Sequence, residues 1–177
     1  MADANLPKRK HVRIKEYNYS LPGAYFVTIC TKNRRCTLSR IVGRGLAPAE
    51  EGLSQAEEPA VVELTQIGEL AKNNLVSLEN KYPNLKIDSY VIMPNHIHVI
   101  FVLTEAAGAS PRPTVMDIVC AYKSLTVREC KAQIDEEFGF QTSFYEHVIR
   151  GREDYEEHIK YINENPMRWY YDELFEE

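Results

Sequence analysis

Residues 85–103, with the sequence LKIDSYVIMPNHIHVIFVL, carry the strongest β signal in the chain. Their many β-branched and aromatic side chains are typical of strands. The Pro94-Asn95 dipeptide interrupts the run, and this pair of residues favours a turn. The segment therefore predicts two antiparallel strands, at about 86–93 and 96–103, that are joined by a tight turn.

Further strands and amphipathic helices are predicted on both sides of this hairpin. The other predicted strands lie at 25–31, 36–42 and 144–149, and the first two are candidates for a second hairpin. The predicted helices lie at 65–81, 114–132 and 153–165. Strands separated by a few helices favour an α+β fold, in which helices pack on an antiparallel sheet as a ferredoxin- or RRM-like sandwich.

The length of 177 residues suits one domain, and we expect residues 1–177 to form it. Residues 43–63 are rich in Gly, Pro, Ala and Glu and lack periodicity, which predicts a variable surface loop, ordered or disordered. No apolar run approaches the roughly 20 residues needed to cross a bilayer, and the N-terminus lacks an apolar signal core. We therefore expect a cytoplasmic protein without a membrane partner.

Positive charge is concentrated near the N-terminus, although the whole chain has a formal net charge of −5. Residues 1–48 carry ten Lys and Arg side chains and two acidic ones, whereas the remainder carries eleven and twenty-four. Residues 1–16 are therefore either a solvated tail or a basic arm that contacts phosphates. The acidic overall charge does not exclude nucleic acid, but it requires a local binding surface.

His96 and His98 are two residues apart in a predicted strand, so both side chains should point to the same face of the sheet. Ile97 and Val99 should point to the opposite face. Two adjacent imidazoles can bind a divalent metal ion, or they can be histidines hydrogen-bonded on the sheet face. Burial of such polar rings costs free energy unless they have partners.

Tyr161 and Asn165 are four residues apart in the third predicted helix, so they share one helical face. Glu157 and His158 lie on the preceding turn. The helix by itself gives neither residue a chemical role, because Tyr161 is also suited to a core position and Asn165 to a cap before Pro166.

Together these segments resemble the single-tyrosine HUH transposases, and most closely the REP-associated tyrosine transposases. The resemblance rests on YVIMPNHIHVI and on FYEHVIRGREDYEEHIKYINENPMRW, with support from PGAYFVTICT and AYKSL. It spans nearly the whole chain except residues 43–63. The family often has Gln where this chain has Asn165.

The resemblance implies a DNA strand transferase that cleaves single-stranded DNA. His96, His98 and Asn165 would bind Mg²⁺ or Mn²⁺, and two imidazoles suit manganese better. Tyr161 would attack the scissile phosphate and form a 5′-phosphotyrosine. A phenol with a pKa near 10 is a weak nucleophile, so His158 is a candidate proton acceptor.

The resemblance also implies single-stranded or hairpin DNA as the partner and leaves monomer and homodimer both open. Basic side chains would contact phosphates. The candidates are Lys8, Arg9, Lys10, Arg13, Lys15, Arg34, Arg35, Arg150 and Arg152.

Three alternatives to this function remain open. The chain can be a DNA-binding protein that has lost catalysis, or a metal-dependent phosphodiesterase that uses water and no covalent step. A nickase of the replication-initiator or relaxase kind is a third alternative, although those proteins usually place their ligands and tyrosines in another order.

Overall fold

The computed structural model describes residues 18–43, 60–105 and 113–176. Four strands form an antiparallel sheet in the order β4-β5-β1-β6. They are β1 (Gly23–Cys30), β4 (Leu85–Ile92), β5 (His96–Leu103) and β6 (Tyr145–Val148). α1 (Gln66–Lys81) connects β1 to β4, and α2 (Val115–Gln133) connects β5 to β6. This βαββαβ order is the ferredoxin-like arrangement, so the predicted α+β class is confirmed.

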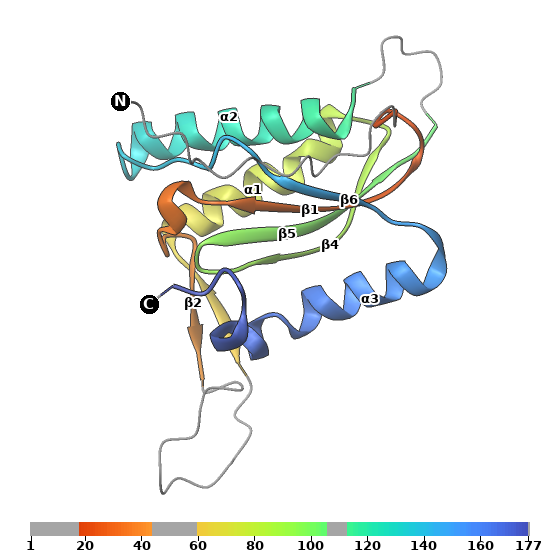
Figure 1. The fold of residues 1–177 in the computed structure, drawn as a ribbon. Coiled ribbons are helices and arrows are strands. Elements are labelled where there is room, and N and C mark those ends of the chain that lie inside the picture. The colour runs from red at the N-terminus through yellow and green to blue at the C-terminus, as the bar shows by residue number, and fades with distance from the viewer. Residues whose placement is uncertain (1–17, 44–59, 106–112, 177) are drawn as a thin grey trace, which may run out of the picture.

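The sheet lies between two helical layers (Figure 1). α1 and α2 cover one face, and α3 (Gly151–Glu164) covers the other. The larger core fills the space between the sheet and α1 and α2, with Tyr25, Leu75 and Tyr122 fully buried. The α3 face has a smaller apolar cluster around Phe26 and Ile162, which leaves part of that face to polar side chains.

The β4-β5 hairpin forms where the sequence predicts it. Ile92 is paired with Ile97, and the amide of Met93 donates to the carbonyl of His96 over 2.8 Å. Pro94 and Asn95 make the tight turn between the strands. This hairpin brings β5 into the centre of the sheet, where it also pairs along the whole of β1.

The predicted hairpin of 25–31 with 36–42 is wrong. β2 (Ser39–Val42) pairs instead with β3 (Val61–Leu64) in a separate two-stranded sheet. β1 has no free edge with which β2 could pair, because β5 and β6 occupy both sides of β1. β3 also overlaps the region 43–63, which was predicted to be a loop, at residues 61–63. Residues 44–59 of that region lie outside the described part of the chain.

The three long helices agree with the prediction to within two residues at each end. The hydroxyl of Thr65 caps α1 by accepting a hydrogen bond from the amide of Gly68 over 3.1 Å. After α3, the chain does not leave the fold at Pro166 but forms a 3₁₀ helix, η2 (Pro166–Tyr171). No described helix combines the length and apolar composition that a membrane span requires.

Candidate active site

His96 and His98 lie at the start of β5 on the face that α3 covers, and both side chains are buried. Their ring centroids are 4.4 Å apart. Ile97 and Val99 belong to the core on the opposite face. The strand therefore presents the two imidazoles side by side, in the arrangement that their spacing predicts.

A hydrogen bond at Nδ1 orients each imidazole. Nδ1 of His96 lies 2.8 Å from Oδ1 of Asn95, and this amide oxygen can only accept, so Nδ1 carries the proton. The Asn95 amide is itself held by donation from Nδ2 to the carbonyl of Leu174 over 2.7 Å. Nδ1 of His98 lies 2.9 Å from Oγ1 of Thr28. Both Nε2 atoms are left to face the site between the sheet and α3.

Burial favours the neutral form of both histidines. It lowers the pKa of His96 to about 4, although the Asp172 charge and the Asn165 side chain act in the opposite direction. Burial also lowers the pKa of His98 well below its usual range, with smaller contributions from the charges of His96 and His158. A neutral imidazole has the free lone pair that a metal ion requires.

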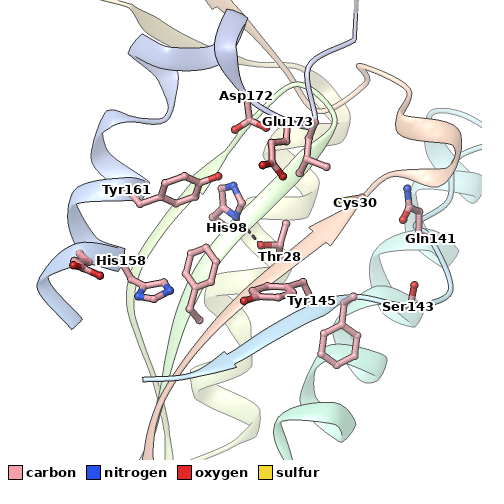
Figure 2. Close-up of a pocket in the computed structure, with 14 residues that line it drawn as sticks. Thr28, Cys30, His98, Gln141, Ser143, Tyr145, His158, Tyr161, Asp172 and Glu173 are labelled. Carbon is pink, nitrogen blue, oxygen red and sulfur yellow. Dashed lines mark hydrogen bonds between the residues drawn. The ribbon is translucent and has the colours of Figure 1, made fainter. Parts of the chain in front are cut away.

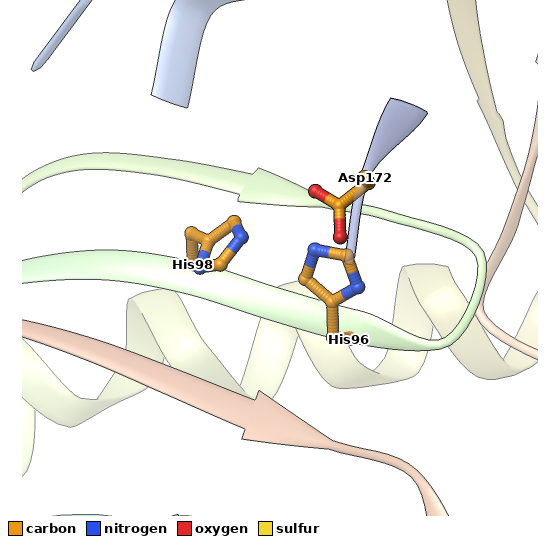
Figure 3. Close-up of side chains that lie close together, drawn as sticks. All are labelled: His96, His98 and Asp172. Atoms are coloured by element: carbon orange, nitrogen blue, oxygen red, sulfur yellow. The ribbon is translucent and has the colours of Figure 1, made fainter. Parts of the chain in front are cut away.

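Asn165 and Asp172 enter the site from the end of α3 and from the residue after η2. The amide Nδ2 of the buried Asn165 donates to Oδ2 of Asp172 over 2.8 Å, which leaves Oδ1 of Asn165 as the remaining acceptor. Donor atoms of His96, His98 and Asp172 all lie within 4.8 Å of one another (Figure 3). Asp172 is not among the residues predicted from the sequence, because no spacing rule predicts that the chain turns back to the sheet after Pro166.

Three buried atoms of this site, His96 Nε2, His98 Nε2 and Asn165 Oδ1, have no hydrogen-bond partner among the described residues. Each buried polar atom without a partner costs about 1–3 kcal/mol. Two imidazole nitrogens, an amide oxygen and a neighbouring carboxylate are suitable ligands for a divalent transition-metal ion. The residues present therefore fit a metal ion of this kind.

Tyr161 reaches the same site from α3, one helical turn before Asn165. Its ring contacts that of His98 edge-on, with the centroids 5.0 Å apart. Its hydroxyl points toward His98, whereas His158 lies at the other end of the tyrosine (Figure 2). This orientation does not favour His158 as the direct proton acceptor from Tyr161.

The Tyr161 phenol is held in its protonated form. Burial, followed by the negative charges of Asp172 and Glu173, raises the pKa of Tyr161 to about 12. The hydroxyl is thus near two carboxylates from the segment that follows η2. Any reaction of this oxygen as a nucleophile requires loss of its proton during attack.

A pocket of about 940 Å³ opens beside Tyr161 and His98 (Figure 2). Aromatic side chains form much of its wall, among them Phe26 and Tyr145. Glu157, Asp172 and Glu173 also line it, whereas none of its described lining residues is lysine or arginine. The pocket thus combines aromatic surface with negative charge.

The arginines proposed as phosphate contacts lie outside this pocket. Arg34, Arg35 and Arg152 each have a carboxylate within 4.0 Å. Arg150 precedes α3 as its N-cap residue. The five candidates from Lys8 to Lys15 lie outside the described part of the chain.

Comparison with known proteins supports the resemblance that the motifs suggest, although no family model matches the chain. The chain is 25% identical to the REP-associated tyrosine transposase of Escherichia coli, over 85% of this chain and 70% of that protein. The resemblance of the motifs to this family is thus matched by sequence similarity to one of its proteins over most of the chain. The chain is also 27% identical to an uncharacterized protein of Haemophilus influenzae, over 98% of this chain and 96% of the other.

A solved structure of a REP-associated tyrosine transposase bound to a REP hairpin has the same fold. The TM-score is 0.57 at 21% sequence identity, and the alignment covers 88% of this chain and 74% of the solved one. The α+β sandwich described above is therefore that of a known transposase.

Proposed function

We propose that this chain is a transposase-type enzyme that cleaves single-stranded DNA with Tyr161 as a covalent nucleophile. One observation carries the proposal: the Tyr161 ring lies 5.0 Å from His98, beside three buried donor atoms without partners. The relationship to a tyrosine transposase supports it independently.

Nε2 of His96, Nε2 of His98 and Oδ1 of Asn165 would hold Mg²⁺ or Mn²⁺, and Asp172 would be a further ligand or would orient Asn165. When bound, the ion would act as a Lewis acid that polarises the scissile phosphate and offsets charge on its oxygens. Manganese accepts imidazole nitrogen more readily than magnesium, which prefers oxygen ligands.

Tyr161 would form a bond from its phenolic oxygen to phosphorus while the bond from phosphorus to the 3′ oxygen breaks. The proton of the phenol is lost and the leaving 3′ oxygen gains one, so charge balances over the step. The product is a 5′-phosphotyrosine and a free 3′-hydroxyl. Because the phosphodiester energy is retained, another 3′-hydroxyl can reverse the step and join a different strand.

The substrate we propose is single-stranded DNA that forms a hairpin, by analogy with the relative solved with a REP hairpin. Residues 1–16 and the arginines Arg34, Arg35, Arg150 and Arg152 would contact its phosphates, because positively charged side chains attract the DNA backbone. We further propose that residues 1–177 act as one domain, in the cytoplasm where such DNA is available.

The test is a cleavage assay on a hairpin oligonucleotide with Mn²⁺, comparing the unaltered chain with Tyr161→Phe. The unaltered chain should attach to the 3′-labelled fragment in a form that survives denaturation, and should release the 5′-labelled fragment. Tyr161→Phe should give neither product. Cleavage retained in Tyr161→Phe would support the water-using phosphodiesterase, and hairpin binding without cleavage would support the inactive DNA-binding protein.

A further inference from the structure

A second group of metal-type ligands lies on the α3 face of the sheet. His147 comes from β6, and Asp154 and His158 come from the first half of α3. Their ligand atoms all lie within 4.8 Å of one another. The Phe26 ring contacts His98 on one side and His158 on another, with centroids at 5.2 Å and 4.6 Å, so this group is distinct from the His96 and His98 site.

The distances within this group match those of ligands on one ion. Nε2 of His147 lies 2.9 Å from Oδ2 of Asp154, and Nδ1 of His158 lies 3.1 Å from Oδ1 of the same carboxylate. The two imidazole rings are stacked, with centroids 4.7 Å apart. With metal–ligand bonds of about 2.1 Å, donors are about 3.4 Å apart at a tetrahedral angle and about 3 Å apart at an octahedral right angle, which is close to the two distances here.

The local chemistry also favours a cation here. Two imidazoles and one carboxylate are a common ligand set for divalent transition-metal ions. The three side chains are only partly buried, so an ion and its water ligands can reach them. His158 lines the pocket beside Tyr161, where Glu157, Asp172 and Glu173 contribute negative charge without a lining lysine or arginine among the described residues.

We propose that His147, Asp154 and His158 bind a second divalent transition-metal ion, such as Zn²⁺ or Co²⁺, at the wall of the pocket. His147 would bind through Nε2 and His158 through Nδ1, which now donates to the backbone carbonyl of Asp154 over 2.7 Å. The bound ion would place positive charge in a pocket whose charged lining residues, among those described, are the carboxylates of Glu157, Asp172 and Glu173. The site does not depend on covalent chemistry at Tyr161.

Titration of the full chain with Co²⁺, followed by its visible absorption and by calorimetry, tests the proposal. The unaltered chain should bind two ions, and His147→Gln should bind one, with at least a tenfold loss of affinity at the second site. Gln keeps a side-chain donor for Asp154, so this variant preserves the hydrogen bond while removing the imidazole ligand.

A double variant that lacks the first site separates binding at the two sites. His96→Ala/His98→Ala should retain one Co²⁺, and adding His147→Gln should remove it, with circular dichroism confirming that each variant is folded. The proposal is overturned if the double variant binds no Co²⁺, or if His147→Gln leaves the stoichiometry of the unaltered chain unchanged. Binding that is lost only in the His96 and His98 variants would support the ion of the proposed active site and would overturn the second ion.

Discussion

Nδ1 of His96 lies 2.8 Å from Oδ1 of Asn95, the residue immediately before it in the chain. Asn95 in turn donates to the carbonyl of Leu174 over 2.7 Å. The turn between β4 and β5 therefore has two functions: it reverses the chain, and it fixes which nitrogen of His96 carries the proton. The segment after η2 completes this arrangement from 79 residues away in the sequence.

Asn95→Ala should weaken Mn²⁺ binding by about 10–100-fold, because second-layer partners of metal-bound histidines have effects of this size. The affinity is measured from the electron paramagnetic resonance signal of unbound Mn²⁺. All three chains also carry His147→Gln, so that only the site of His96 and His98 binds the ion. Asn95→Asp keeps an acceptor for His96 and should retain more affinity than Asn95→Ala. Equal affinity in all three chains would contradict an orienting role for Asn95.

Glu173→Gln should lower the pKa of Tyr161 from about 12, because Glu173 raises it through its negative charge. Burial and the Asp172 charge contribute more than Glu173, so the pKa should fall only part of the way toward 10. Titration of the tyrosinate absorbance, as the difference between each chain and its Tyr161→Phe counterpart, isolates this residue. An unchanged titration would show that the Glu173 carboxylate does not act on the phenol.

Stability should decrease in acid because the pKa of His96 falls from 6.5 to about 4 on folding. The unfolded chain binds a proton at higher pH than the folded chain does, so the contribution is complete above pH 6.5 and is lost as the pH falls toward 4. Tm measured between pH 7 and pH 4.5 should fall, and less steeply in His96→Gln. The pKa of His98 is lowered in the same direction, so Tm should still depend on pH in His96→Gln. The same dependence of Tm on pH in both chains would contradict a contribution from His96.

Gly68→Ala should destabilise the fold at the contact of α1 with the segment before β2. A Cβ at Gly68 would lie 1.9 Å from the carbonyl oxygen of Leu38, which also accepts a hydrogen bond from the amide of Thr65. The loss should be at least about 1–3 kcal/mol in the free energy of unfolding, measured with denaturant. Gly139→Ala is the matched control, since its Cβ would meet only the Lys32 side chain at 3.7 Å.

The sequence is sufficient to predict those features that depend on local periodicity. Alternation along 96–99 places His96 and His98 on one face, and helical spacing places Tyr161 and Asn165 on another, as the structure has them. These two faces meet because of the way α3 packs on the sheet. No local pattern in the sequence specifies this packing.

The remaining features depend on contacts between distant segments. The pairing of β2 with β3 brings together strands on either side of residues 44–59, and it is favoured because β1 already has two neighbours. Asp172 reaches the histidines only because η2 continues the chain past Pro166. Neither arrangement leaves a periodic signal in the sequence.

The most direct test of the central claim is peptide mass mapping of the chain after reaction with a hairpin oligonucleotide and Mn²⁺. Covalent catalysis by Tyr161 predicts a phosphate-linked DNA fragment on the peptide that contains Tyr161, and none in His96→Ala/His98→Ala. Cleaved DNA with no adduct, or an adduct on a tyrosine other than Tyr161, would contradict it.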